Sequence, residues 1–136
     1  FANLLNAFTC TECGRCTSAC PASITGKSLS PRQIMMATRD RVEESLDKGE
    51  SAKDNHLLDN FISRESLWAC TSCNACVEVC PLNIDPLDII LQMRQYLTME
   101  ESAAPAPLNS MMSNIENNGA PWAFPAASRG DWIKDA

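Results

Sequence analysis

Two stretches of one pattern decide the fold: CTECGRCTSACP at residues 10–21 and CTSCNACVEVCP at residues 70–81. Each has the spacing C-x2-C-x2-C-x3-C-P, and together they hold all eight cysteines of the chain. We call them the first array and the second array. A repeat of this kind indicates a duplicated structural unit with a pseudo-twofold relation between its copies.

The spacing within each array suits a cubic iron–sulfur cluster. Three cysteines at three-residue intervals let a short coiled loop direct three sulfurs to three corners of one cube, and the fourth ligand comes from elsewhere. The proline after each fourth cysteine fixes φ and turns the chain away from the loop. In bacterial ferredoxins the fourth cysteine of each run binds the other cluster. We therefore expect two 4Fe-4S clusters, one bound by Cys10, Cys13, Cys16 and Cys80 and the other by Cys70, Cys73, Cys76 and Cys20.

Two other uses of cysteine compete with this interpretation. A disulfide scaffold is typical of short secreted chains, but the sulfurs of such triplets would be crowded, and the charged remainder of the chain does not resemble a loop-rich disulfide fold. Zinc sites take four ligands, usually from two cysteine pairs, and would leave cysteines of each triplet unused. Both alternatives are less favourable than two clusters.

Length and charge limit the function classes. The chain has 136 residues, which suits one domain with a possible appendage, and a formal net charge of −6. Oxidised clusters with their thiolates add further negative charge, so nucleic acid is not an expected partner.

No stretch approaches the roughly 20 apolar residues that span a bilayer. Thiols that bind iron indicate a reducing compartment, so we expect a cytoplasmic location. Because the first residue is Phe and not Met, we also expect a longer parent polypeptide.

The remainder of the chain indicates helices. Ser30-Pro31 and Asp85-Pro86 are helix starts with N-cap residues, and apolar residues at helical intervals follow each of them. Gly49 ends the first of these helices, and Ser63 starts a short helix into the second array. Residues 50–62 are polar with a weak apolar set. No segment has the pattern of a strand, so we predict an all-α fold.

Composition changes after Glu101, where Ala, Pro and Asn become frequent. We therefore predict a helical dicluster domain at residues 1–102 and an extended tail at 103–136 that packs on a partner. A short amphipathic helix ending at Gly119 is expected within the tail. Its apolar face would consist of Leu108, Met111, Met112 and Ile115.

Residues 5–102 resemble the helical 4Fe-4S dicluster domain, or alpha-helical ferredoxin, of heterodisulfide-reductase-like iron–sulfur oxidoreductases. The segments FTCTECGRCTSACPASITGKSLSPRQIMMATRDR and WACTSCNACVEVCPLNIDPLDIILQMRQYLTMEES are especially similar to membrane-associated members of that group. The ending, with NNGAPW and then Ser-Arg129-Gly-Asp-Trp132, is similar to the connector that leads into their cysteine-rich CCG domains. Full-length members also carry a membrane bundle and CCG domains. Neither is present here, so the resemblance assigns no substrate chemistry to this chain.

The resemblance implies a domain that relays single electrons within a membrane-associated respiratory oxidoreductase complex. The implied partners are a flavoprotein, a CCG-type domain, or a membrane haem or quinone subunit. Contact with the membrane would be indirect, at the inner face of the cell membrane. The alternative is a structural or sensing iron–sulfur module that mediates assembly without redox turnover. No catalytic triad, phosphate loop or dinucleotide motif indicates an enzyme site.

Four other residues have two interpretations each. His56 is expected at the surface and not as a ligand, because eight cysteines already complete both clusters. Arg39 and Arg94 either pack their stems and pair with nearby carboxylates, or they face a partner or a cluster. Arg15 lies inside the first array, where the second array has Ala75. It either raises the potential of one cluster or is simply solvated.

Overall fold

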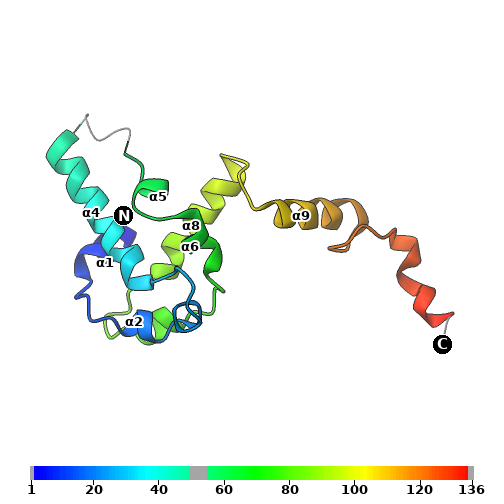
Figure 1. Cartoon of the computed structure of the whole chain (residues 1–136), viewed down its shortest axis with the longest axis horizontal. Coiled ribbons are helices and arrows are strands. Elements are labelled where there is room, and N and C mark those ends of the chain that lie inside the picture. Colours follow the sequence, from blue (N-terminus) through cyan, green and yellow to red (C-terminus); the bar gives the residue numbers. More distant parts are fainter. Residues whose placement is uncertain (1, 50–54, 135–136) are drawn as a thin grey trace. The chain divides into compact units, whose positions relative to one another are not determined.

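The computed structural model describes residues 2–49 and 55–134 and divides into two compact units, residues 1–96 and 97–136 (Figure 1). Over those described residues the structure is helical and contains no strand, only one isolated β-bridge between Leu58 and Ile62. The all-α prediction is therefore confirmed. The two units are considered separately.

Two long helices form the frame of the first unit, α4 (Pro31–Lys48) and α8 (Pro86–Met99). At the start of α4 the Ser30 hydroxyl accepts a hydrogen bond from the Gln33 N–H, at 3.4 Å, and Gly49 ends the helix with φ of +53°. At the start of α8 the Asp85 carboxylate accepts from the Asp88 N–H, at 3.0 Å. Both predicted starts are confirmed, because the side chains satisfy N–H groups that have no partner within the helix.

Short helices connect and cover these two. They are α1 (Ala2–Thr9), α2 (Arg15–Ser18), α3 (Pro21–Ile24), α5 (Leu57–Asn60), α6 (Arg64–Ala69) and α7 (Ala75–Glu78). The start of α6 at Ser63 is confirmed, since its hydroxyl accepts from the Ser66 N–H at 3.2 Å. Helices this short are not stable alone. They depend on packing, as α1 does where it lies against α4.

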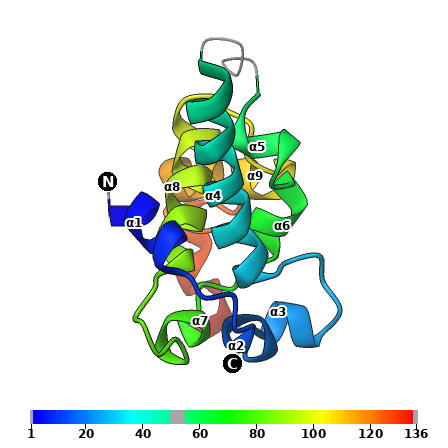
Figure 2. The same ribbon diagram turned by 90° about the vertical axis from the view of Figure 1, so that its left-hand side faces the viewer.

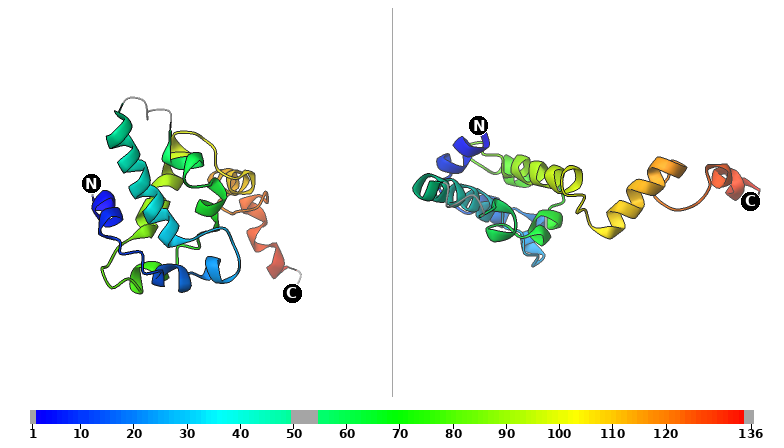
Figure 3. Two further views of the ribbon diagram at one scale, coloured as in Figure 1. Left: turned by 60° about the vertical axis from the view of Figure 1, so that its left-hand side comes forward. Right: turned by 90° about the horizontal axis from the view of Figure 1, so that it is seen from above.

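The hydrophobic core lies along the inner sides of the long helices. Ile34 and Met35 of α4, Leu67 of α6 and Ile90 of α8 are all at most 2% exposed. Beyond the core, α2 and α7 lie side by side at one end of the unit, beneath the starts of α4 and α8 (Figures 2 and 3). The core thus supports the two array loops from one side.

The sequence also predicts a polar segment with an exposed His56 before the second array. His56 is exposed, as expected. Within the weak apolar set, Ile62 is buried and Leu57 is half-buried. The predicted polar stretch 50–62 begins outside the described residues, because 50–54 are not among them.

The second unit contains α9 (Ala106–Asn118) and a 3-10 helix, η2 (Ala126–Ile133). The predicted tail helix is confirmed, including its end at Gly119, which has φ of +66°. Large apolar side chains of this unit remain exposed: Trp122 is 60% exposed, Phe124 67% and Trp132 71%. None of the described residues in α9 is buried.

Candidate iron–sulfur cluster sites

The two array loops have the same backbone conformation. Glu12 and Gly14 in the first loop have positive φ (58° and 81°), and Ser72 and Asn74 stand at the equivalent places in the second (55° and 65°). Gly14 and Asn74 also begin α2 and α7, and their carbonyls accept from N–H groups three and four residues on. Loops with left-handed residues turn N–H groups inward and form concavities that bind anions, iron–sulfur sites included.

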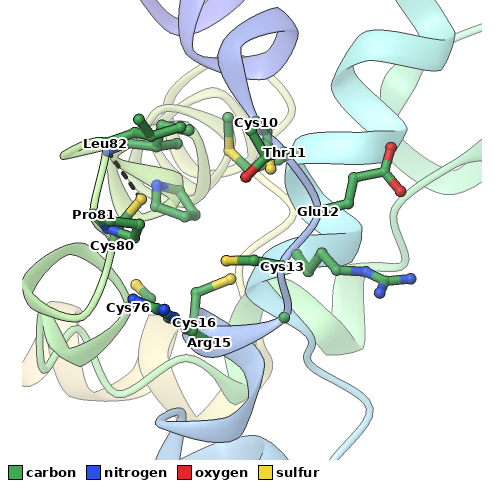
Figure 4. Close-up of a pocket in the computed structure, with 15 residues that line it drawn as sticks. Cys10, Thr11, Glu12, Cys13, Arg15, Cys16, Cys76, Cys80, Pro81 and Leu82 are labelled. Carbon is green, nitrogen blue, oxygen red and sulfur yellow. Dashed lines mark hydrogen bonds between the residues drawn. The ribbon is translucent and has the colours of Figure 1, made fainter.

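The first array surrounds one hollow, whose far wall comes from the other half of the chain. Cys10, Cys13 and Cys16 line it on the side of the first loop, and Cys80 lines it from the end of the second array (Figure 4). Pro81, Leu82 and Ile84 complete that wall. The structure thus brings together the four cysteines that the sequence assigned to one cluster.

The second hollow is formed in the same way with the halves exchanged. Cys70, Cys73 and Cys76 line it from the second loop, and Cys20 lines it from the end of the first array. Cys76 also lines the first hollow, so the two hollows share one wall. Cys20 and Cys76 are buried, whereas Cys13 and Cys73 are exposed.

The starts of the long helices lie between the hollows. Pro31 lines the second hollow, and Arg32 and Met35, a little further along α4, line the first. Conversely Pro86 lines the first hollow, and α8 then contributes Leu87 and Ile90 to the second. The positive ends of both helix dipoles therefore face the region where negative charge is expected.

The donor set fits clusters better than single ions. Within residues 2–49 and 55–134, no three His, Cys, Asp or Glu side chains converge closely enough to hold one metal ion. Four thiols spread around a hollow suit a body with several iron corners, whereas ligands of one zinc ion lie about 2.3 Å from a common point. Backbone N–H groups also reach sulfur, with Ser72 donating to Cys70 Sγ and Ile84 to Cys80 Sγ, each at 3.4 Å.

Burial changes the acidity of the thiols. Loss of solvent raises the pKa of Cys76 to about 11, and the neighbouring sulfurs of Cys70 and Cys20 add to the effect. Loss of solvent also raises the pKa of Cys16. Hydrogen bonds from the Ala75 backbone and the Thr71 side chain lower the pKa of Cys73. Since iron binds thiolates, loading of the protein releases protons from the buried thiols.

Arg39 and Arg94 each hold one array loop. Arg39 Nη2 lies 2.5 Å from Glu12 Oε1, and this carboxylate raises the pKa of the guanidinium. The Glu12 carboxylate points away from the sulfurs of the first hollow (Figure 4). The expected pairing with a carboxylate is confirmed for Arg39.

Arg94 holds the second loop through its backbone. Its Nε and Nη2 donate to the Leu67 carbonyl at 3.0 and 2.5 Å, and Nη2 donates to the Cys70 carbonyl at 2.6 Å. The guanidinium also lies over the Trp68 ring, 5.1 Å from its centre. Hydrogen bonds to main-chain carbonyls thus tie the guanidinium of Arg94 to the second loop.

Sequence reasoning missed Arg32, which lines the first hollow beside Arg15. A signal was present in the repeat, because Arg32 and Leu87 each follow the proline that starts a long helix. Aligning the two copies therefore pairs Arg32 with Leu87, but only the packing of α4 and α8 shows which hollow each residue lines.

Comparison with known proteins identifies the family. Residues 9–84 match the family described as the 4Fe-4S dicluster domain. The match covers more than half of the chain, and the chain therefore belongs to this family. It is an all-helical domain with two 4Fe-4S clusters.

The relatives include a ferredoxin, an oxidoreductase and a subunit of a reductase. A probable membrane-anchored ferredoxin of Chromohalobacter salexigens is 32% identical over 150 residues, 97% of this chain and 22% of the relative. An EtfAB:quinone oxidoreductase of Syntrophomonas wolfei is 32% identical over 157 residues, 98% of this chain and 22% of the relative. One subunit of the ferredoxin:CoB-CoM heterodisulfide reductase of Methanosarcina mazei is 31% identical over 91 residues, 67% of this chain and 46% of that subunit.

The chain thus spans less than a quarter of the first two relatives and under half of the third. It is an iron–sulfur electron-transfer domain related to this heterodisulfide reductase subunit and to membrane-anchored iron–sulfur oxidoreductases. No helix within the described ranges is both long and apolar enough to cross a membrane.

Proposed function

We propose that the eight cysteines bind the two clusters in the crossed arrangement. The first site would use Cys10, Cys13, Cys16 and Cys80, and the second Cys70, Cys73, Cys76 and Cys20. Support comes from the hollows. The first is lined by Cys10, Cys13 and Cys16 together with Cys80 and Cys76 of the second array, and the second by Cys70, Cys73 and Cys76 together with Cys20. When bound, each cluster accepts and releases one electron at a time.

The two sites would act as a relay. The observation that carries this proposal is the wall shared by the hollows, where the buried Cys76 lines both. Neighbouring centres within one packed unit let an electron pass from one to the other. The surrounding apolar side chains, Met35 on one side and Ile90 on the other, keep water from the inner faces of the sites.

The wider context follows from the relatives. Their names include a quinone oxidoreductase, a membrane-anchored ferredoxin and a subunit of a heterodisulfide reductase. We place the chain in a membrane-associated respiratory oxidoreductase complex at the cytoplasmic face of the membrane, with indirect membrane contact. Its electron donor would be a flavoprotein. Its acceptor would be a CCG-type domain or a membrane haem or quinone subunit, and residues 103–136 would be the connector to a partner.

A stepwise reductive titration of the anaerobically loaded full chain tests the relay. We expect about eight iron and eight acid-labile sulfide per chain, two one-electron reduction steps, and full recovery of the oxidised spectrum on reoxidation. The recovery matters because a structural or sensing module requires no reversible reduction. Clusters that cannot be reduced, or that are lost in a single cycle, would contradict the relay.

A further inference from the structure

The duplication provides an internal comparison of the two sites, because residues of the first array and of the start of α4 have sequence equivalents in the second array and at the start of α8. Arg15 follows the left-handed Gly14 at the start of α2, and Ala75 follows Asn74 at the start of α7. Arg32 follows Pro31 in α4, and Leu87 follows Pro86 in α8. Both arginines line the first hollow. Two cationic side chains that line one site therefore correspond to two apolar side chains in the other copy, of which Leu87 lines the second hollow.

The other charged residues near the sites add no further cation to the lining of either hollow. Glu12 also lines the first hollow, but its carboxylate is paired with Arg39. Asp85 is next to two lining residues, yet its carboxylate accepts from the Asp88 N–H at the start of α8, and Asp85 is not itself a lining residue. Arg94 places a positive charge at the second loop, where its guanidinium donates to the Leu67 and Cys70 carbonyls, but it does not line the second hollow.

The described walls of the second hollow contain no charged side chain. They consist of Cys20, Leu29, Pro31, Cys70, Thr71, Cys73, Asn74, Cys76, Leu87 and Ile90. Arg15 and Arg32 are therefore the two lining cations without a counterpart at the equivalent positions of the other copy, and the one lining anion, Glu12, is paired with Arg39.

We propose that Arg15 and Arg32 make the site of Cys10, Cys13, Cys16 and Cys80 the one with the higher reduction potential. Reduction adds one electron to a cluster, breaks no bond and requires no proton, so it makes the site more negative by one charge. Nearby cations stabilise that added charge. This inference rests on the relay function proposed above.

A direction of electron flow follows. Electrons would enter at the site of Cys70, Cys73, Cys76 and Cys20 and come to rest at the site of the first array. The partner that donates electrons would then approach the second loop, and the acceptor would approach the first loop with its exposed Arg15 and Arg32. An acceptor with acidic side chains at its docking face suits that surface.

The test is a reductive titration of the full chain, followed by electron paramagnetic resonance, in wild type and in Arg32→Leu. Leucine is the residue that α8 has at the equivalent position. The variant Cys13→Ser identifies which signal belongs to which site. Cys13 belongs to the site of the first array whichever array supplies its fourth ligand, so the signal that changes in this variant is that of the first array. In wild type we expect the first-array signal to develop first.

At a fixed potential, Arg32→Leu should lower the ratio of molecules with a reduced first site to molecules with an oxidised first site by roughly two- to threefold. This is the effect expected from removing a unit charge about 8 Å away in a medium with the dielectric constant of water. The second site should change less. Arg15→Ala repeats the test if Arg32→Leu does not fold. The control is Lys48→Leu, which removes the same charge from the far end of α4. That position lies about 24 Å along the helix and beyond the screening length, so no shift is expected.

The inference is overturned if the second site is reduced first in wild type, or if Arg32→Leu and Arg15→Ala shift neither site more than Lys48→Leu does. Failure of the relay itself would look different, since neither site would then be reduced reversibly in any variant.

Discussion

Arg39 and Arg94 stand at equivalent places on α4 and α8, yet they hold the array loops by different contacts. Arg39 makes one ion pair whose partners have side chains 22% and 35% exposed. Arg94 donates to two main-chain carbonyls and lies over an aromatic ring. Leaving a buried carbonyl without a hydrogen-bond donor costs more free energy than losing a solvated ion pair. The two arginines therefore differ in their contribution to the stability of the protein.

Paired substitutions measure this difference. We expect Arg94→Gln to lower the free energy of unfolding of the loaded protein by about 1.5–3 kcal/mol, the range for hydrogen bonds from charged groups. Arg39→Gln should cost about 0–1 kcal/mol, since solvent screens its ion pair. Denaturation midpoints followed by cluster absorbance give both values. Equal losses, or a larger loss for Arg39→Gln, would show that the carbonyl contacts of Arg94 do not stabilise the second loop.

At the scale of the element, different residues precede helices α2 and α7, yet the two array loops have the same backbone conformation. Gly14 and Asn74 have positive φ at the same place in the two loops, and both residue types adopt that conformation more readily than others. A Cβ added at Gly14 would meet no protein atom within 4 Å, so within the protein itself the cost of a side chain there is backbone strain.

Gly14→Ala should therefore lower the free energy of unfolding of the loaded protein by about 1–2 kcal/mol, the cost of the left-handed conformation for an ordinary residue. Gly14→Asn, which copies the second array, should cost less. Gly130→Ala is the control, since that glycine lacks a positive φ and also has open space around it. If Gly14→Ala lowers the free energy of unfolding by no more than the control does, the loop accommodates alanine without strain.

A helix could be predicted from the sequence where neighbouring residues along the chain determine its ends. Ser30, Asp85 and Gly49 act on neighbouring N–H and carbonyl groups, so the ends of the long helices could be predicted from sequence. Helices α1, α2 and α7 were not predicted, because they are short and depend on packing or on the loop around a cluster. Arg32 was missed for the same reason, since its place at the first hollow follows from how α4 packs over both arrays.

At the scale of the whole molecule, the chain consists of two units. The first unit contains both hollows and most of the buried core. The second unit leaves Trp122, Phe124 and Trp132 exposed, and aromatic side chains bury much area at low entropic cost when a partner covers them. A docking role for the tail is consistent with these exposed aromatic side chains.

Deletion of residues 105–136 tests that role. We expect the truncated protein to keep both clusters, because every cysteine lies before the deletion, and to bind its partner subunit or domain more weakly. Iron content and co-purification with the native complex are the measurements. Loss of the clusters, or unchanged association, would show that the tail belongs to the fold and is not a connector.

In crossed binding each half of the molecule completes the cluster of the other half, and replacement of the fourth cysteine of each array tests this arrangement. Cys20→Ser and Cys80→Ser are each loaded anaerobically, and paramagnetic resonance follows the two sites, assigned with Cys13→Ser and Cys73→Ser. Crossed binding predicts that Cys20→Ser alters the site of Cys70, Cys73 and Cys76, and that Cys80→Ser alters the site of Cys10, Cys13 and Cys16. If Cys20→Ser alters only the site of the first array, each array binds its own cluster and crossed binding is wrong.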